Sequence, residues 1–408
     1  MLRRTLFAAV ACLALSVPLQ AIAGSDPRLS QDQRIDAILK DLRPKAPAPS
    51  GGATSPASPG AVTPRTLQEE MAAHHVPAVS IAVIDGGRVV WARAYGLADV
   101  ASGRKATPRT LFQAASMSKP VAATAALALV QEGRLALDED VNRRLTSWRL
   151  PYGGKAAGKV VTLRELLNHT GGLSVSWYDG YEPGAPLPTD VQILDGAPPA
   201  HSPPVVVSHE PGAEWRYSGG GYMLAQVLMA DAAKQSFPEL MRARVLVPAG
   251  MSASTYEQPL PADKRPLAAT GYRIDGAAMP HGYHVYPEMA AAGLWTTPSD
   301  LARWMLAIQD AYAGRSAKII SQATAAAMLT PAQGEWGLGV EVQGQGDGLL
   351  FTHGGSNQGY KGMFLGYARG GRGVVVMTNG DGGGPVAIEL VAAVIRAYGW
   401  PEQPPAPK

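Results

Sequence analysis

The fold of this chain is decided around one stretch, Gln113-Ala114-Ala115-Ser116-Met117-Ser118-Lys119-Pro120, which precedes an apolar run over 121–130. Ala and Leu dominate the run, and both are strong helix formers. Pro120 suits the first turn of a helix, where its missing N–H breaks no hydrogen bond. We therefore expect a helix that begins at Ser116 and ends near Gly133.

Two polar side chains of this stretch fit nucleophilic catalysis. Ser116 and Lys119 are three residues apart, so on a helix they share one face, with Cβ atoms roughly 5–6 Å apart. The amine can take the hydroxyl proton, and a helix N-terminus favours developing negative charge. A pattern this short also occurs by chance, so its significance depends on partners elsewhere in the chain.

Composition bounds the function classes. With 408 residues the chain can bury a large core and form more than one domain. Its 46 Gly and 34 Pro predict many loops and turns. The formal net charge is only +3, without a Lys/Arg cluster, so nothing favours nucleic-acid binding.

Residues 1–23 are typical of a secretory signal peptide. Two arginines precede an apolar run over 6–17, and Ala21-Ile22-Ala23 provides a small-x-small cleavage site. The alternative is a membrane anchor, for which the run is short. The single cysteine, Cys12, lies in this segment, so the mature chain has neither a disulfide nor a thiol nucleophile. We expect a periplasmic or secreted product without a membrane span.

The remaining chain divides into a leader, a main domain and a tail. Residues 24–65 contain an amphipathic helix over 30–42 and a linker rich in Pro, Ala, Gly and Ser. The sequence leaves open whether this helix docks or is solvated. The main domain covers 66–400, with a helical lobe within about 134–300, and residues 401–408 form the tail.

Strands are predicted at both ends of the main domain, with helices between them. The predicted strands are 79–85, 88–95, 337–343, 349–353, 359–368 and 373–379. The other predicted helices are 66–75, 162–168, 221–233, 238–247, 298–309 and 385–398. We therefore predict an α+β fold in which the two ends build one antiparallel sheet, flanked by helices, with a helical insertion lobe.

A second motif contains Tyr217, within Trp215-Arg216-Tyr217-Ser218-Gly219-Gly220-Gly221-Tyr222. It lies on a loop ahead of a helix, from which a phenol can point into a cleft. Such a tyrosine can relay protons if a nearby lysine ammonium lowers its pKa from about 10. The alternative is a packed tyrosine with a hydrogen-bonded hydroxyl.

A third motif, Phe351-Thr352-His353-Gly354-Gly355-Ser356-Asn357-Gln358-Gly359, ends a predicted strand in small residues. Substrate could approach the backbone there. Its N–H groups could form half of an oxyanion hole, with the N–H of Ser116 as the other half. The alternative is a hairpin turn. A fourth stretch, 166–173, is interpreted as a helix that stops at glycine.

In order and spacing, these motifs resemble serine β-lactamases, penicillin-binding D,D-peptidases and related esterases and D-amino-acid peptidases. The resemblance is closest to the class C β-lactamase branch, extends over about 66–398 and includes the stretches 133–138 and 293–301. It implies an antiparallel sheet flanked by helices beside an all-helical lobe, with the site in the cleft between them. From the residues themselves, we expect no metal and no cofactor.

The resemblance also implies residue roles. Ser116 would be the acylated nucleophile and Lys119 its general base. Tyr217 falls on the tyrosine of the family's Tyr-x-Asn element, and His353-Gly354-Gly355 falls on its Lys-Thr-Gly element. The N–H of Ser356 matches the second oxyanion donor. Oxyanion and substrate binding would therefore involve Ser116, Ser356, His353 and Gly355.

Two departures from the family pattern concern the substrate. Gly219 replaces the asparagine of Tyr-x-Asn, which removes an amide that would hold the substrate's acyl-side amide. His353 replaces the lysine of Lys-Thr-Gly, and a histidine with a pKa near 6.5 is mostly neutral at pH 7. We therefore expect an exported serine hydrolase that cleaves an ester, amide or peptide bond without requiring a substrate carboxylate.

Alternatives remain. The first is a β-lactamase or D-Ala-D-Ala carboxypeptidase, and the second is a non-catalytic penicillin- or peptide-binding sensor with the same fold. Aromatic residues at Trp177, Tyr178 and Tyr181, with His201, form either a wall or lid over the cleft or simple packing. The partner is a small-molecule or peptide substrate, whose identity, like the oligomeric state, the sequence leaves unknown.

Overall fold

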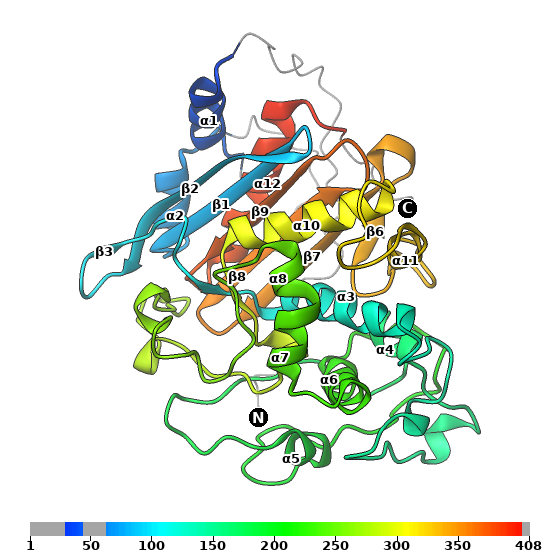
Figure 1. Ribbon diagram of the computed structural model, residues 1–408. Coiled ribbons are helices and arrows are strands. Elements are labelled where there is room, and N and C mark those ends of the chain that lie inside the picture. Colours follow the sequence, from blue (N-terminus) through cyan, green and yellow to red (C-terminus); the bar gives the residue numbers. More distant parts are fainter. Residues whose placement is uncertain (1–28, 44–62, 402–408) are drawn as a thin grey trace, which may run out of the picture.

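A seven-stranded antiparallel sheet with the order β3-β2-β1-β9-β8-β7-β6 lies at the centre of the molecule (Figure 1). The computed structural model describes residues 29–43 and 63–401. The predicted signal peptide, most of the linker and the tail from 402 on lie outside these ranges. Strands from both ends of the main domain share the sheet, so the α+β prediction is confirmed.

The strands of the large sheet are β1 Ala78–Asp85, β2 Arg88–Asp99, β3 Arg104–Lys105, β6 Glu341–Gln343, β7 Leu350–Asn357, β8 Tyr360–Tyr367 and β9 Gly373–Thr378. A second, two-stranded sheet pairs β4 Phe112–Gln113 with β5 Trp295–Thr296.

The helices follow the chain in this order: α1 Gln31–Lys40, α2 Leu67–Ala73, α3 Ser118–Gln131, α4 Leu163–Leu167, α5 Asp190–Asp195, α6 Gly219–Ala233, α7 Phe237–Met241, α8 Val247–Ala249, α9 Met289–Ala292, α10 Pro298–Tyr312, α11 Gln322–Met328 and α12 Gly383–Tyr398. In Figure 1, α10 crosses one face of the sheet, α12 covers the other, and α3 to α8 gather below.

Strand β1 shows why the sheet is covered on both faces. Val79, Ile81 and Val83 alternate along the strand and pack in one core with α12. Ala78 and Ala82 point to the opposite face and belong to the core that includes α10. The two-residue period of a strand sends neighbours to opposite sides, so a strand that is apolar at nearly every position is buried on both.

The leader helix docks on the main domain, which answers the question that the sequence left open. Ser30 and Gln33 form a capping box at the start of α1. Ile35 and Ile38 are 6% and 1% exposed and pack in the same core as α12. The backbone bridge between Leu42 and Arg65 then joins the two described segments. α1 therefore extends the hydrophobic core between the sheet and α12, which we call the outer core.

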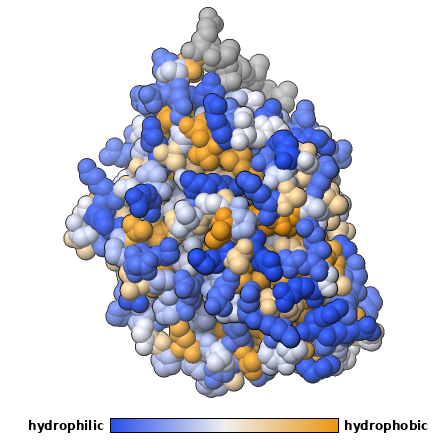
Figure 2. Space-filling view, viewed as in Figure 1, coloured by the Kyte–Doolittle hydropathy of each residue, from blue (hydrophilic) through white to orange (hydrophobic). Residues whose placement is uncertain are grey.

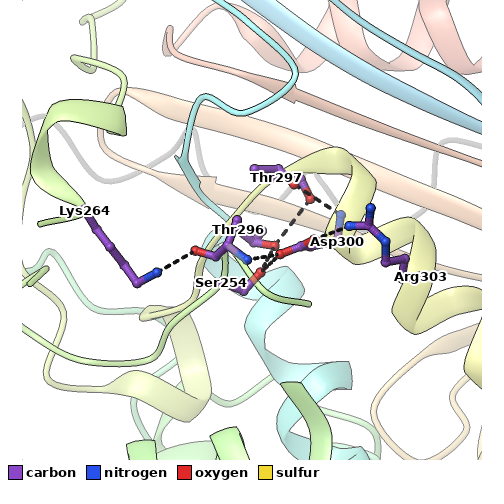
Figure 3. A network of polar contacts seen from close by, with 7 residues as sticks. Ser254, Lys264, Thr296, Thr297, Asp300 and Arg303 are labelled. Carbon is purple, nitrogen blue, oxygen red and sulfur yellow. Dashed lines mark hydrogen bonds and ion pairs between the residues drawn. The ribbon is translucent and has the colours of Figure 1, made fainter. Parts of the chain in front are cut away.

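A buried carboxylate fixes the start of α10 (Figure 3). The Thr297 side chain caps the helix by accepting from the Asp300 N–H at 3.2 Å. Asp300 Oδ2 accepts from the Ala253 N–H at 2.9 Å and from the Ser254 hydroxyl at 2.8 Å, and Oδ1 pairs with Arg303 at 2.5 Å. The helix start and the 253–254 loop are thereby held as one unit.

The same network reaches the nucleophile segment through β5. The hydroxyls of Ser254 and Thr296 lie 2.7 Å apart. Thr296 pairs with Phe112 of β4, and β4 ends three residues before Ser116. The stretch 293–301, which was identified above only by resemblance, thus supports the backbone that leads to Ser116.

Several predicted boundaries were wrong, and two of them lie at the candidate site. The helix expected from Ser116 begins at Ser118, after a 3₁₀ turn over Ala115–Met117. The strand expected to end at His353 continues to Asn357, because all of these residues pair with β8. The segment 174–211 is irregular as expected, except for α5, which begins with a capping box.

Hydrophilic residues dominate the face in Figure 2, with hydrophobic residues in small separate patches. Among residues 29–43 and 63–401, no helix combines the length and hydropathy that a membrane span requires.

Candidate active site

Ser116 lies in the tight turn between β4 and α3. Ala115 has a φ of 51°, in the left-handed region that is unfavourable for a residue with a Cβ atom. Strand β7 approaches this turn closely: a Cβ atom on Gly355 would lie 2.3 Å from the Ala114 carbonyl oxygen. Glycine at 355 therefore allows the sheet edge to lie directly against the nucleophile segment.

Lys119 lies one helical turn after Ser116 and is 2% exposed. Its Nζ is 3.1 Å from Ser116 Oγ and donates to the Ala291 carbonyl of α9 at 2.8 Å. Burial lowers the pKa of Lys119 to about 7, because a charged amine loses hydration in the interior. A substantial fraction of the amine is therefore unprotonated at neutral pH and can accept the proton of Ser116.

Tyr217 enters from the loop before α6. Its phenol hydrogen-bonds the Ser116 side chain, and Lys119 Nζ lies 4.9 Å from the centre of its ring. Burial raises the pKa of Tyr217 above its ordinary value, which is opposite to the lowering considered from the sequence. The phenol is therefore protonated at neutral pH and fits a proton donor. The structure brings all three predicted catalytic residues together.

His169 positions Tyr217, a contact that sequence reasoning missed. The helix does stop here as predicted, since α4 ends at Leu167. The His169 ring, however, lies 4.3 Å from the Tyr217 ring, centre to centre. Its Nδ1 accepts from the Ser218 N–H at 3.2 Å, and its carbonyl accepts from the Arg216 N–H at 2.8 Å. His169 thus holds the backbone on both sides of Tyr217.

His353 is 5% exposed and lies on the β7 edge. Its Nδ1 is 2.6 Å from the Gly354 carbonyl; since a carbonyl only accepts, Nδ1 carries the hydrogen. Burial, and then the charge of Lys119, lowers the pKa of His353 to about 3. Nε2 is therefore an acceptor, and no hydrogen-bond partner in the described chain satisfies it. The expectation of a neutral histidine agrees with this geometry.

Trp336 is a second residue that sequence reasoning missed. Its ring lies 5.4 Å from His353, 5.0 Å from His169 and 6.1 Å from Tyr217, centre to centre. Trp215 stacks on it at 5.4 Å. A Trp between Gly334 and Gly337 was the available signal, but nothing local connects it to residues of other elements. These rings form an aromatic wall beside the catalytic groups.

Beyond Thr352, strand β7 offers an open edge. β6 pairs only with Leu350–Thr352. Residues 353–357 therefore have no strand partner on that side among the described residues, and they lie against the nucleophile turn instead. Asn357 anchors the far end by donating to Gln113 Oε1 of β4 at 2.8 Å. Ser356 is exposed at this edge, and its N–H stays a predicted oxyanion donor.

The comparisons with known proteins agree with this arrangement. A family model described as Beta-lactamase matches residues 64–398. The chain belongs to the β-lactamase family. Among curated relatives, "Protein flp" of Staphylococcus aureus (strain N315) is 27% identical over 258 residues, which cover 59% of this chain and 47% of that protein. "Penicillin-binding protein 4*" of Bacillus subtilis (strain 168) is 28% identical over 214 residues, covering 52% and 45%. The chain thus spans slightly less than half of each relative.

Solved structures share the β-lactamase-family fold. The octameric penicillin-binding protein homologue from Pyrococcus abyssi is 25% identical, with a TM-score of 0.66 over 81% of this chain and 76% of that one. A class C β-lactamase is 22% identical, with a TM-score of 0.64 over 81% and 93%. The second likeness supports the fold alone.

Gly219, where the chain departs from the family pattern, lies in a tightly packed position. A Cβ atom there would lie 3.1 Å from the Ser176 carbonyl oxygen and 3.2 Å from Tyr178 Cε2. The irregular segment that carries Tyr178 therefore occupies the space beside α6 that a side chain at 219 would need. Within residues 29–43 and 63–401, no cluster of three or more His, Cys, Asp or Glu side chains is arranged to hold a metal ion.

Proposed function

We propose that this β-lactamase-family chain is an exported serine hydrolase that cleaves an ester, amide or peptide bond through an acyl-enzyme. The observation that carries the proposal is the 3.1 Å contact between Ser116 Oγ and the buried Nζ of Lys119, whose pKa is lowered to about 7. An adjacent base activates a serine hydroxyl, and the unprotonated amine of Lys119 can act as that base.

In acylation, Ser116 Oγ attacks the substrate carbonyl while Lys119 accepts its proton. The N–H groups of Ser116 and Ser356 stabilise the oxyanion of the tetrahedral intermediate. The intermediate collapses as Tyr217 protonates the leaving group, and the proton on Lys119 replaces the one that Tyr217 has given. Water then attacks the acyl-enzyme, and its proton returns to Ser116 as the acid leaves. The protonated phenol of Tyr217 supports its role as donor.

The substrate class follows from His353. Its Nε2 is an acceptor without charge, because Nδ1 donates to Gly354 and the pKa is lowered to about 3. Such a nitrogen attracts an N–H or O–H group and offers no charge for a carboxylate. We therefore favour esters and amides without an obligatory carboxylate over β-lactams. Export rests on the sequence pattern of residues 1–23 alone.

The test is Ser116→Ala, which is expected to lower hydrolysis of short-chain p-nitrophenyl esters by more than about a thousandfold. Labelling by a fluorophosphonate should disappear as well, because both need the same hydroxyl. Ser102→Ala, at an exposed serine of the β2–β3 turn, is the matched control and should leave both unchanged.

Parental turnover by Ser116→Ala would refute the nucleophile assignment. Faster wild-type turnover of the esters than of nitrocefin would favour an esterase or amidase, and faster turnover of nitrocefin would favour a β-lactamase. Mass spectrometry after incubation with penicillin separates an enzyme from a sensor, since a stable adduct without turnover of any ester would favour the sensor.

A further inference from the structure

A cavity of about 250 Å³ lies beside the candidate active site. It is lined by parts of the irregular segment between α4 and α6 and by Glu288, which directly precedes α9. Its lining consists of Val175, Ser176, Trp177, Tyr178, Asp179, Gly180, Tyr181, His201, Ser202, Pro203 and Glu288. The aromatic residues left open by the sequence, as a lid or as packing, therefore form the wall of a cavity.

Three polar atoms of this lining are buried without a hydrogen-bond partner in the described chain. They are Glu288 Oε2, Tyr178 Oη and Ser202 Oγ. Glu288 is only 1% exposed. Buried polar atoms are nearly always paired, and an unpaired buried carboxyl is costly. Three such atoms around one cavity indicate a binding site for a polar group.

Two residues that line the cavity, Glu288 and Tyr178, lie next to segments that hold the catalytic residues. Glu288 directly precedes α9, in which the Ala291 carbonyl accepts from Lys119 at 2.8 Å. Tyr178 packs against Gly219, two residues after Tyr217. A substrate whose carbonyl lies at Ser116 would therefore have this cavity as a neighbour.

The chemistry of the lining selects a cation. The lining combines the carboxyl group of Glu288 with the aromatic side chains of Trp177, Tyr178 and Tyr181. Aromatic ring faces attract ammonium groups. The other charged groups nearby, Asp179 and Asp190, are acidic and disfavour the ionised form of Glu288. Burial, with these neighbours, raises the pKa of Glu288 to about 8. A bound ammonium would lower the pKa of Glu288 again, because it would pair with the ionised carboxylate.

We propose that this cavity is a subsite for a protonated amine of the substrate, held by Glu288 with Tyr178 and Ser202. The proposal rests on the serine hydrolase function proposed above and narrows its substrates to amine-bearing esters or amides. The aliphatic part of the amine would pack on the rings of Trp177, Tyr178 and Tyr181. Its N–H groups would donate to the three unpaired oxygens.

Two measurements on the full-length protein test the subsite. The first compares kcat/KM for p-nitrophenyl 6-aminohexanoate and p-nitrophenyl heptanoate, which differ by an ammonium in place of a methyl group. The second compares hexylammonium and 1-hexanol as inhibitors of p-nitrophenyl acetate hydrolysis, and does not depend on which side of the scissile bond carries the amine. We expect a preference for the ammonium of at least about tenfold in one or both.

Glu288→Gln keeps the shape of the side chain and removes its charge, so the ammonium preference should fall toward one. Glu182→Gln, at an exposed acid of the same segment, removes the same charge and should keep the preference. Wild-type protein without any preference in either measurement overturns the proposal. So does a preference that Glu288→Gln leaves intact.

The failure of the subsite can be told apart from the failure of the proposed function. With wild-type protein, equal hydrolysis of both esters together with equal inhibition by hexylammonium and 1-hexanol rejects the subsite. If Ser116→Ala then hydrolyses neither ester, the hydrolase assignment stands. Should Glu288→Gln not fold, the wild-type comparison still decides. Calorimetric titration of Ser116→Ala with hexylammonium tests the cavity without turnover, and absence of binding there counts against it.

Discussion

The residue that controls the chemistry at neutral pH is Lys119. Its amine must be unprotonated to accept the proton of Ser116, and burial lowers its pKa to about 7. We expect kcat/KM for a neutral ester to rise tenfold per pH unit below about pH 7 and to level off above it. Up to pH 9 we expect no decrease in kcat/KM from ionisation of Tyr217, because burial raises its pKa above the ordinary value and the phenol stays protonated.

This profile is measured between pH 5 and pH 9.5 on wild-type protein, with stability checked across the range. Lys119→Arg keeps a cation but cannot lose its proton, so its activity should be nearly absent at every pH. A wild-type profile that still rises at pH 9 would mean that the amine retains an ordinary lysine pKa.

A second residue-scale prediction concerns His169, which touches Tyr217 by its ring and holds the backbone at Ser218 and Arg216. His169→Ala should lower kcat about tenfold to a hundredfold, with a smaller change in KM, because a misplaced phenol delivers its proton poorly. His169→Asn should recover part of the loss. Asparagine tolerates the left-handed φ of 64° at this position and can still accept from Ser218.

Steady-state kinetics on both variants, with thermal unfolding as the structural readout, checks the role of His169. If kcat fell only in proportion to lost folded protein, His169 would be a packing residue alone. A rise in KM with kcat unchanged would place it in substrate binding instead.

At the scale of elements, the start of α10 holds the backbone that leads to the nucleophile. Asp300 is 1% exposed and accepts from Ala253 and Ser254 while pairing with Arg303. Asp300→Ala should lower the free energy of unfolding by about 3 kcal/mol, because it leaves these donors unpaired. Asp310→Ala, on the same helix, removes an exposed ion pair with Arg315, which lies just after the helix, and should cost less than about 1 kcal/mol.

Urea unfolding of the two aspartate variants provides the comparison. Equal losses would mean that the network at the start of α10 contributes no more than a surface ion pair. Since Thr296 joins this network to β4, we also expect Asp300→Ala to lose some activity in the fraction that stays folded.

On the scale of the whole molecule, the sheet separates two cores with different tasks. The outer core holds α1, α2 and α12 and closes the sheet on the face opposite α10. The inner core joins the sheet to α3, α6 and α9, which carry or hold Lys119, Tyr217 and the cavity at Glu288. The candidate site thus lies where the open edge of β7 meets the helical lobe.

Features that depend on near neighbours in the chain were predictable from the sequence. In the structure, Thr66 and Thr162 cap their helices, and each has a glutamate three residues later that completes a capping box. These caps, and the spacing that places Lys119 one turn after Ser116, depend only on residues within a helical turn. The shared antiparallel sheet was predictable too, because strand patterns at both chain ends need a common partner.

Only the tertiary structure decided the rest. Burial set the direction of the Tyr217 pKa, since the loss of hydration outweighs the hydrogen bond with Ser116. Pairing with β8 carried β7 through Gly354 and Gly355. The aromatic wall at Trp336 and the cavity at Glu288 join segments distant in sequence, and no local pattern reports which of them will meet.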